Sequence, residues 1–375
     1  MAHPYPYANS AQALYWPALG PRFFDGWNPS EARRDRDLLC AEMSRLAYAQ
    51  REAVAAALST IKFSLHGWIG GETAEQRAAT RGTDGFIATS DDEDLTVLAF
   101  RGTESNKPED LLADAMATSI PWRSQDSSRG NVHRGFAATY ARVRDDIEQA
   151  LATTSGPLLI TGHSLGAALA TLAAADLGPR GRELITFGSP LVGDRAFRQE
   201  LAGVTVRRFI DCCDLVARIP PKRFDASHIE TLLIDLVSSP SRVEPIVTGL
   251  IKVGAAGLAR ALDVLHVRPE YEHVCDAIYV DRHGKRMDHA AADSIAADQQ
   301  GARHDYRGGF TPDAGRLLHE LKTVFEAGTS LDAHAMRVAV RDFGAKLFQG
   351  DPVPLRDLAD HAPINYVSAF TGRVS

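Results

Sequence analysis

Ser164 occupies a short motif that could make it a nucleophile. It is the centre of a Gly-His-Ser-Leu-Gly motif at residues 162–166, directly after the apolar run 158–161 and directly before an alanine- and leucine-rich run. A strand, a sharp turn and a helix in this order expose the serine hydroxyl, and flanking glycines let the two backbones pack closely. The pattern predicts a serine that attacks a carbonyl carbon, with the helix N-terminus beside the developing negative charge.

A nucleophilic serine needs a histidine that accepts its proton and a carboxylate that orients this histidine. In α/β-hydrolases the acid and then the base follow the serine along the chain. Asp214, shortly after the strand-like run 204–210, is the candidate acid, and Asp211 is its nearby rival. The histidines that follow Asp214 are His228, His266, His273, His283, His289, His304, His319, His334 and His361. Chain order alone does not choose among them.

Strand-like and helical patterns alternate along the first two thirds of the chain. The strand-like runs are residues 85–89, 95–100, 158–161, 183–187, 204–210 and 277–280, and helical patterns cover residues 31–58, 136–152 and 165–177. Strands that alternate with helices favour a mainly parallel sheet covered on both faces. The predicted fold class is therefore α/β.

The chain of 375 residues is long enough for one large α/β domain with insertions. Residues 1–30 are rich in Pro, Tyr, Trp and Gly and are expected to form an extended arm on that domain, which would comprise residues 31–375. Helical patterns interrupt the alternation at about 222–268 and 285–352, which we interpret as insertions or cap elements. Within the second insertion, the polar tract 288–307 is expected to be a mobile loop.

Residues 243–265 form the most apolar long segment, with charged residues along one arc at helical spacing. Both packing against the core and contact with a lipid surface fit such a helix. The segment is interrupted by charges and is not expected to span a membrane.

Composition limits the partners. The net charge of −7 argues against nucleic acid. The four cysteines, Cys40, Cys212, Cys213 and Cys275, lack metal-binding spacing, and the adjacent pair is expected to lie in the core rather than to be redox-active.

The N-terminal residues lack the basic start and apolar run of a signal peptide, so we expect a cytoplasmic protein. Export by a route that needs no signal peptide is the alternative. The oligomeric state is not predicted.

Five segments together resemble the class 3, fungal-type lipase family. They are the strand and Phe-Arg-Gly-Thr of residues 95–104, Val-His-Arg-Gly-Phe at 132–136, the elbow at 162–168, Thr-Phe-Gly-Ser-Pro-Leu-Val-Gly at 186–193 and Asp-Leu-Val-Ala-Arg-Ile-Pro-Pro at 214–221. Ala217 departs from the family, which usually has proline there. The resemblance implies an α/β-hydrolase fold.

The resemblance also implies roles for individual residues. It makes Ser164 the nucleophile and Asp214 the acid. The family's base is often an Asp-His pair followed shortly by Asn-Tyr, which matches His361 well and His304 only loosely. The backbone amide of Leu165 and Thr103, through its amide or its hydroxyl as well, would form the oxyanion hole. Arg101, His133 and His163 are expected to hold loops together rather than to act on substrate, and His273 matches a non-catalytic position.

The segment 105–120 corresponds to the family's lid, which here is either a fixed surface helix or a mobile cover. The resemblance implies a lipid-ester hydrolase that needs no cofactor or metal and that contacts a lipid interface transiently. A phospholipase with the same chemistry is the alternative, and an exported effector fits that alternative. A non-enzymatic lipid carrier is a third hypothesis, which the Ser-Asp-His order disfavours.

Overall fold

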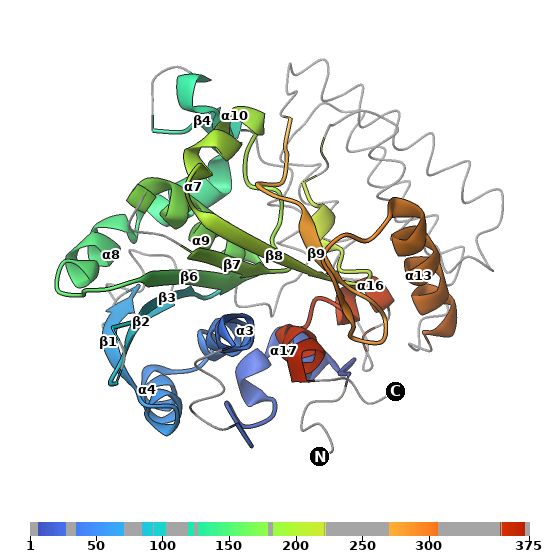
Figure 1. Ribbon diagram of the computed structural model, residues 1–375, viewed down its shortest axis with the longest axis horizontal. Helices are drawn as coiled ribbons and strands as arrows, with labels where there is room; N and C mark the ends of the chain where they lie inside the picture. Colours follow the sequence, from blue (N-terminus) through green and yellow to red (C-terminus); the bar gives the residue numbers. More distant parts are fainter. Residues whose placement is uncertain are drawn as a thin grey trace, which may run out of the picture.

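The centre of the molecule is an eight-stranded sheet (Figure 1). The computed structural model describes residues 7–27, 35–70, 85–92, 94–102, 119–123, 127–178, 183–220, 222, 270–306, 353 and 355–371. In spatial order the strands are β1 (Phe63–Ile69), β2 (Gly85–Ser90), β3 (Thr96–Phe100), β6 (Leu158–His163), β7 (Glu183–Phe187), β8 (Thr205–Asp211), β9 (Ala277–Val280) and β10 (Arg286–Met287).

The strands from β3 to β9 pair in parallel, whereas β1, β2 and β3 pair antiparallel at one edge and β9 and β10 at the other. All six predicted strands are present. Their apolar runs are continuous because helices cover both faces of a parallel sheet. The edge strand β1 was not predicted, since it alternates buried and more exposed residues and contains the polar Ser64 and His66.

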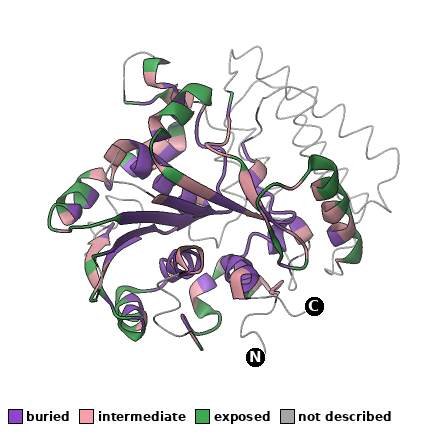
Figure 2. Ribbon diagram, viewed as in Figure 1, coloured by how far each residue is buried: buried purple, intermediate pink, exposed green. Residues whose placement is uncertain are grey.

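Helices cover both faces of the sheet and bury its centre (Figures 1 and 2). One face packs against α3 (Arg36–Leu46), α4 (Arg51–Thr60) and α17 (Pro363–Thr371), and the other against α7 (Arg134–Ala141), α8 (Arg144–Leu151) and α9 (Leu165–Leu177). The helix predicted over 165–177 is confirmed. The helical regions predicted over 31–58 and 136–152 are each two helices, broken at turns after Leu46 and Ala141.

Residues 292–305 of the tract 288–307 form a helix and not the predicted mobile loop. The helix α13 (Ala292–Asp305) lies beside the β9 end of the sheet (Figure 1). Its polar composition misled the sequence interpretation because the contacts that hold it are tertiary. Gln299 donates from Nε2 to the carbonyl oxygen of Cys212 at 2.7 Å, and Arg303 forms a bidentate ion pair with the buried Asp357.

The N-terminal arm contains α1 (Ala11–Tyr15) and the 3-10 turn η1 (Pro17–Leu19), so it is not extended throughout. It is tied to α17 because the Asn365 amide bonds both backbone groups of Ala8, accepting at 2.7 Å and donating at 2.8 Å. The remaining elements are β4 (Ser119–Pro121), η2 (Ser127–Arg129), β5 (Asn131–His133), α10 (Arg195–Arg198), η4 (Gln199–Leu201), η5 (Val216–Arg218) and α16 (Arg356–Ala359).

Several predicted features lie outside the described residues. They are the amphipathic segment 243–265, Thr103 and the lid segment 105–120 apart from its last two residues, which begin β4. Across the described ranges, no helix combines the length and the apolar character that a membrane crossing requires.

Candidate active site

Ser164 lies in a strained turn between β6 and α9. Its φ of 60° and ψ of −130° are conformations that a residue with a side chain rarely adopts. A Cβ atom on Gly162 would lie 2.3 Å from the carbonyl of Gly166, and one on Gly166 would lie 2.4 Å from the carbonyl oxygen of Phe100. The predicted need for small residues on both sides of the serine is therefore confirmed.

The elbow offers a backbone donor for an oxyanion. Leu165 is the first residue of α9, and the first amides of a helix have no acceptor within it. The end of β3 lies against the same turn, since a Cβ atom on Gly102 would lie 3.0 Å from the carbonyl oxygen of His163. This contact brings the chain to the elbow one residue before Thr103. The oxyanion role of Thr103, which lies outside the described residues, stays a prediction.

Asp214 and His361 form a buried pair beside the elbow. The Nδ1 atom of His361 lies 2.9 Å from Oδ2 and 3.0 Å from Oδ1 of Asp214. A proton on Nδ1 satisfies this contact and leaves Nε2 as the acceptor, the tautomer that a general base requires. Val216 donates its backbone amide to Oδ1 at 2.8 Å, which holds the carboxylate in place.

Ser164 and His361 flank the same short segment at the end of β7. The amide of Ser164 donates to the carbonyl oxygen of Phe187 at 3.1 Å. The next residue, Gly188, has a φ of +57°, and a Cβ atom there would lie 3.0 Å from Nδ1 of His361 and 2.6 Å from Oδ2 of Asp214. The structure thus brings the three residues of the predicted triad to one end of the sheet.

Asp211, the other candidate acid, is linked to the Asp214–His361 pair through its backbone amide and the Tyr366 hydroxyl. Its amide donates to the Tyr366 hydroxyl at 3.1 Å, and that hydroxyl donates a short hydrogen bond to Oδ2 of Asp214. Burial first, and then the charge of Asp214, raise the pKa of Tyr366 well above its usual value, so it remains a donor. In the sequence, Asn365-Tyr366 is only part of the pattern that follows His361, and nothing there predicts this contact.

Replacing Tyr366 with Phe is expected to lower kcat/KM about tenfold, because a hydrogen bond to a charged carboxylate is lost. The fall should lie in kcat rather than in KM, because the hydroxyl contacts the proposed acid and not the substrate. Tyr140→Phe is the matched control, because Tyr140 donates to Asp176 at 3.0 Å elsewhere on the fold. An unchanged kcat in Tyr366→Phe would show that the hydroxyl serves packing alone.

His163 is buried between His361 and Tyr48, which lies in the turn after α3. Its Nδ1 accepts from the Tyr48 hydroxyl at 3.0 Å, and its Nε2 donates to the carbonyl oxygen of His361 at 2.7 Å. The rings of His163 and His361 lie 4.4 Å apart. Burial first, and then the charge of His361, lower the pKa of His163 well below its ordinary value. His163 is therefore neutral in the folded protein.

The lowered pKa of His163 predicts a loss of stability in acid. A histidine that is neutral when folded takes up a proton on unfolding, so its contribution is complete above the unfolded pKa of about 6.5 and falls below it. The slope reaches about 1.4 kcal/mol per pH unit for one proton. Urea unfolding at pH 5 and pH 8 should show a smaller pH-dependent loss in His163→Asn than in the wild type. Equal losses would contradict the assignment.

The other residues considered from the sequence lie apart from the pair or support it. His304 is exposed on α13, where its Nδ1 contacts Asp305. His273 donates a hydrogen bond from Nε2 to the carbonyl oxygen of Ala217 at 2.8 Å. The His133 side chain caps α7 by accepting from the amide of Phe136, as expected of a structural residue.

Comparisons with known proteins point to one family. The model of the family "Lipase (class 3)" matches residues 97–224. A lipase from Rhizopus niveus is 31% identical over 160 residues, which are 39% of this chain and 40% of that protein. A chloroplastic phospholipase A(1) from Arabidopsis thaliana is 36% identical over 107 residues, which are 24% of each chain. The chain thus spans less than half the length of either relative.

The solved structures found include a lipase from Rhizopus microsporus var. chinensis, with a TM-score of 0.41 and 24% identity over 51% of this chain and 70% of that one. The family match contains the elbow, the Phe-Gly-x-Pro segment and Asp214 in the predicted order. Residues 97–224 are thus similar to the class 3 lipase family, and the mainly parallel sheet with helices on both faces is an α/β fold, as predicted.

Proposed function

We propose that this protein is a serine carboxylic-ester hydrolase of lipase type that cleaves acylglycerols or related lipid esters. The observation that carries the proposal is the buried Asp214–His361 pair beside the strained Ser164 turn. A serine held in an unfavourable backbone conformation next to an oriented imidazole is the arrangement that acyl transfer uses.

In the proposed reaction, Ser164 attacks the ester carbonyl carbon and His361 accepts the hydroxyl proton on Nε2. The bond from Nδ1 to Asp214 keeps the imidazole in the required tautomer and stabilises the imidazolium. The amide of Leu165, together with Thr103, binds the negative charge on the tetrahedral oxygen. His361 then protonates the leaving alcohol, and water attacks the acyl-enzyme by the same path to release the fatty acid.

A second candidate function keeps this chemistry and changes the substrate. Similarity to the chloroplastic phospholipase A(1) favours a phospholipase that removes one acyl chain from a membrane lipid.

One substrate panel tests both candidates. Purified protein is given a p-nitrophenyl ester, a triglyceride emulsion and phospholipid vesicles, and the products are identified by mass spectrometry. Free fatty acid from the emulsion supports the acylglycerol hydrolase, and lysophospholipid from the vesicles supports the phospholipase. In parallel, a fluorophosphonate probe should label Ser164. Absence of labelling together with inactivity on all three substrates would refute hydrolysis and favour a lipid-carrying protein.

A further inference from the structure

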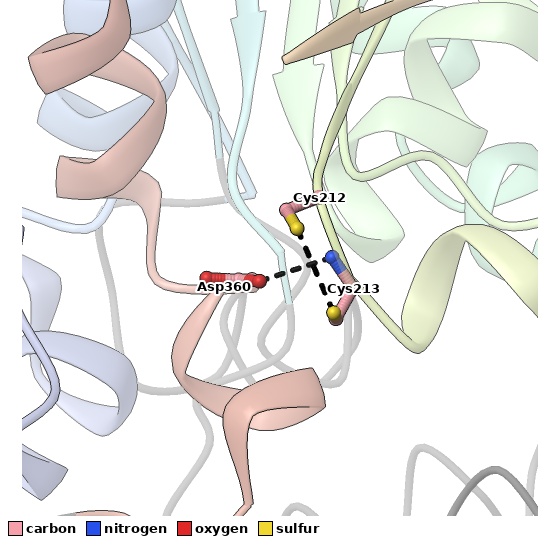
Figure 3. Close-up of side chains that lie close together, drawn as sticks. All are labelled: Cys212, Cys213 and Asp360. Carbon is pink, nitrogen blue, oxygen red and sulfur yellow. Dashed lines mark hydrogen bonds between the residues drawn. The ribbon is translucent and has the colours of Figure 1, made fainter. Parts of the chain in front are cut away.

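Two adjacent thiols lie immediately behind the Asp214–His361 pair. Cys212 and Cys213 connect β8 to Asp214, and their Sγ atoms are 3.6 Å apart (Figure 3). Asp360, the residue before His361, accepts a hydrogen bond from the backbone amide of Cys213 at 3.0 Å. All three side chains are buried. The cluster therefore joins the chain that carries the acid to the chain that carries the base.

The surroundings favour reaction of the thiols with each other over binding of a cation. The Asp360 carboxylate already accepts from the Cys213 amide and forms an ion pair with Arg356, whose Nε lies 2.7 Å from Oδ1. A metal ion would have to compete with that guanidinium for the carboxylate. Both cysteines are free, with their Sγ atoms 3.6 Å apart, and the hydrogen bond with Cys213 and then burial raise the pKa of Cys212, so this group is a neutral thiol.

We propose that Cys212 and Cys213 form a reversible disulfide that switches off the hydrolytic site. This inference rests on the proposed function. The two thiols lose two protons and two electrons as the S–S bond forms. A low-molecular-weight disulfide accepts these as two thiols, and a dithiol reductant reverses the reaction through a mixed disulfide.

The geometry explains both the reversibility and the effect on the site. Bridged cysteines usually have Cα atoms about 4.4–6.8 Å apart, whereas neighbours across a trans peptide are about 3.8 Å apart. Closing the ring thus strains the backbone, and a strained disulfide is readily reduced. The backbone of Cys212 is already unusual, with a φ of +27°. Any change there is passed to Asp214 directly and to His361 through the bond between Cys213 and Asp360.

Helix α13 covers the dithiol and controls access to it. The carbonyl oxygen of Gln299 lies 3.6 Å from Sγ of Cys213, and the Asp298 carboxylate lies 3.5 Å from Sγ of Cys212. The Arg303–Asp357 ion pair ties α13 to α16. Local opening of this helix would expose both thiols to an oxidant.

The test follows the thiols and the activity separately. Reduced wild-type protein is incubated with oxidised glutathione, and the tryptic peptide 209–218 is analysed, because it contains these two cysteines and neither Cys40 nor Cys275. We expect this peptide to lose two hydrogen atoms in mass while ester hydrolysis falls at least about tenfold, the size of effect expected when the acid and base of a triad are misaligned. Dithiothreitol should restore both.

Matched variants separate this pair from the other thiols. Cys40→Ser/Cys275→Ser should respond as the wild type does, whereas Cys213→Ser should form no disulfide within the peptide and keep its activity under oxidant. If Cys213→Ser does not fold, recovery of the dithiol and of the activity when dithiothreitol is added to the oxidised wild type decides whether the disulfide is the cause of the loss. Arg303→Ala should oxidise several-fold faster than Arg129→Ala, which breaks an ion pair with Glu200 elsewhere.

A dithiol that persists at 209–218, a glutathione adduct in place of the internal bond, or a disulfide without loss of activity would each overturn the inference. Inactivity of the fully reduced wild type on every ester would instead refute the proposed function. The mass measurement would still report on the disulfide in that case.

Discussion

Ser164→Ala is expected to reduce ester hydrolysis by about 10⁶-fold while the protein remains folded, because on the proposed assignment this hydroxyl attacks the ester carbonyl and carries the acyl group. The methyl side chain of alanine fits the same turn, so the strain at a φ of 60° is retained rather than relieved. Initial rates on a p-nitrophenyl ester measure the loss, and thermal unfolding by circular dichroism checks the fold.

Ser368→Ala is the matched control for the nucleophile. Ser368 is also buried, and its hydroxyl donates to the carbonyl oxygen of Ile364 at 2.9 Å on α17. It should keep most of the activity. A Ser164→Ala protein that hydrolyses the ester at more than about one hundredth of the wild-type rate would mean that another residue is the nucleophile, since a triad without its serine retains far less.

His361→Ala is expected to reduce the same rate by about 10⁶-fold, because removing either the serine or the histidine of such a unit costs about as much as removing the whole unit. Two further consequences distinguish a base from a packing residue. Labelling of Ser164 by a fluorophosphonate should slow in parallel with hydrolysis, since activation of the hydroxyl is lost. Hydroxide should also replace the base in part, so the residual rate should rise steeply with pH.

His304→Ala is the control that the sequence itself supplies, because His304 was the rival base. It is exposed on α13 beside Asp305, and its loss should leave kcat/KM within about twofold of the wild type, as for most surface substitutions. The reverse outcome, with His361→Ala active and His304→Ala inactive, would move the base to α13 and refute the proposed pair.

The strands of the sheet were predictable because each is marked by a continuous apolar run in its own sequence. Strands buried on both faces must be apolar throughout, so runs such as 158–161 and 183–187 are visible without any tertiary information. The helix α13 was not predictable in the same way. Its Asp, Gln and Gly residues obscured the helical signal of its alanines, and what fixes it are contacts with Cys212 and Asp357, which lie far away in the sequence.

The residues of the candidate site also differ in whether their local sequence predicts them. The elbow is a continuous motif, so Ser164 and the strained turn follow from the sequence. Tyr366 does not, because its partners Asp211 and Asp214 precede it by about 150 residues and nothing in its neighbourhood marks it as a donor to them. His361 was chosen by resemblance to a family, since chain order alone left nine histidines open.

The position of His361 on the chain has a consequence for biosynthesis. About 200 residues separate Ser164 from His361, and ribosomes add about 5–20 residues per second, so the nucleophile precedes its base by roughly 10–40 s. Asn365, one turn beyond the base, must also reach back to Ala8. On the proposed assignment, a growing chain carries the elbow long before it can cleave a lipid, and the nascent protein is harmless to the membranes around it.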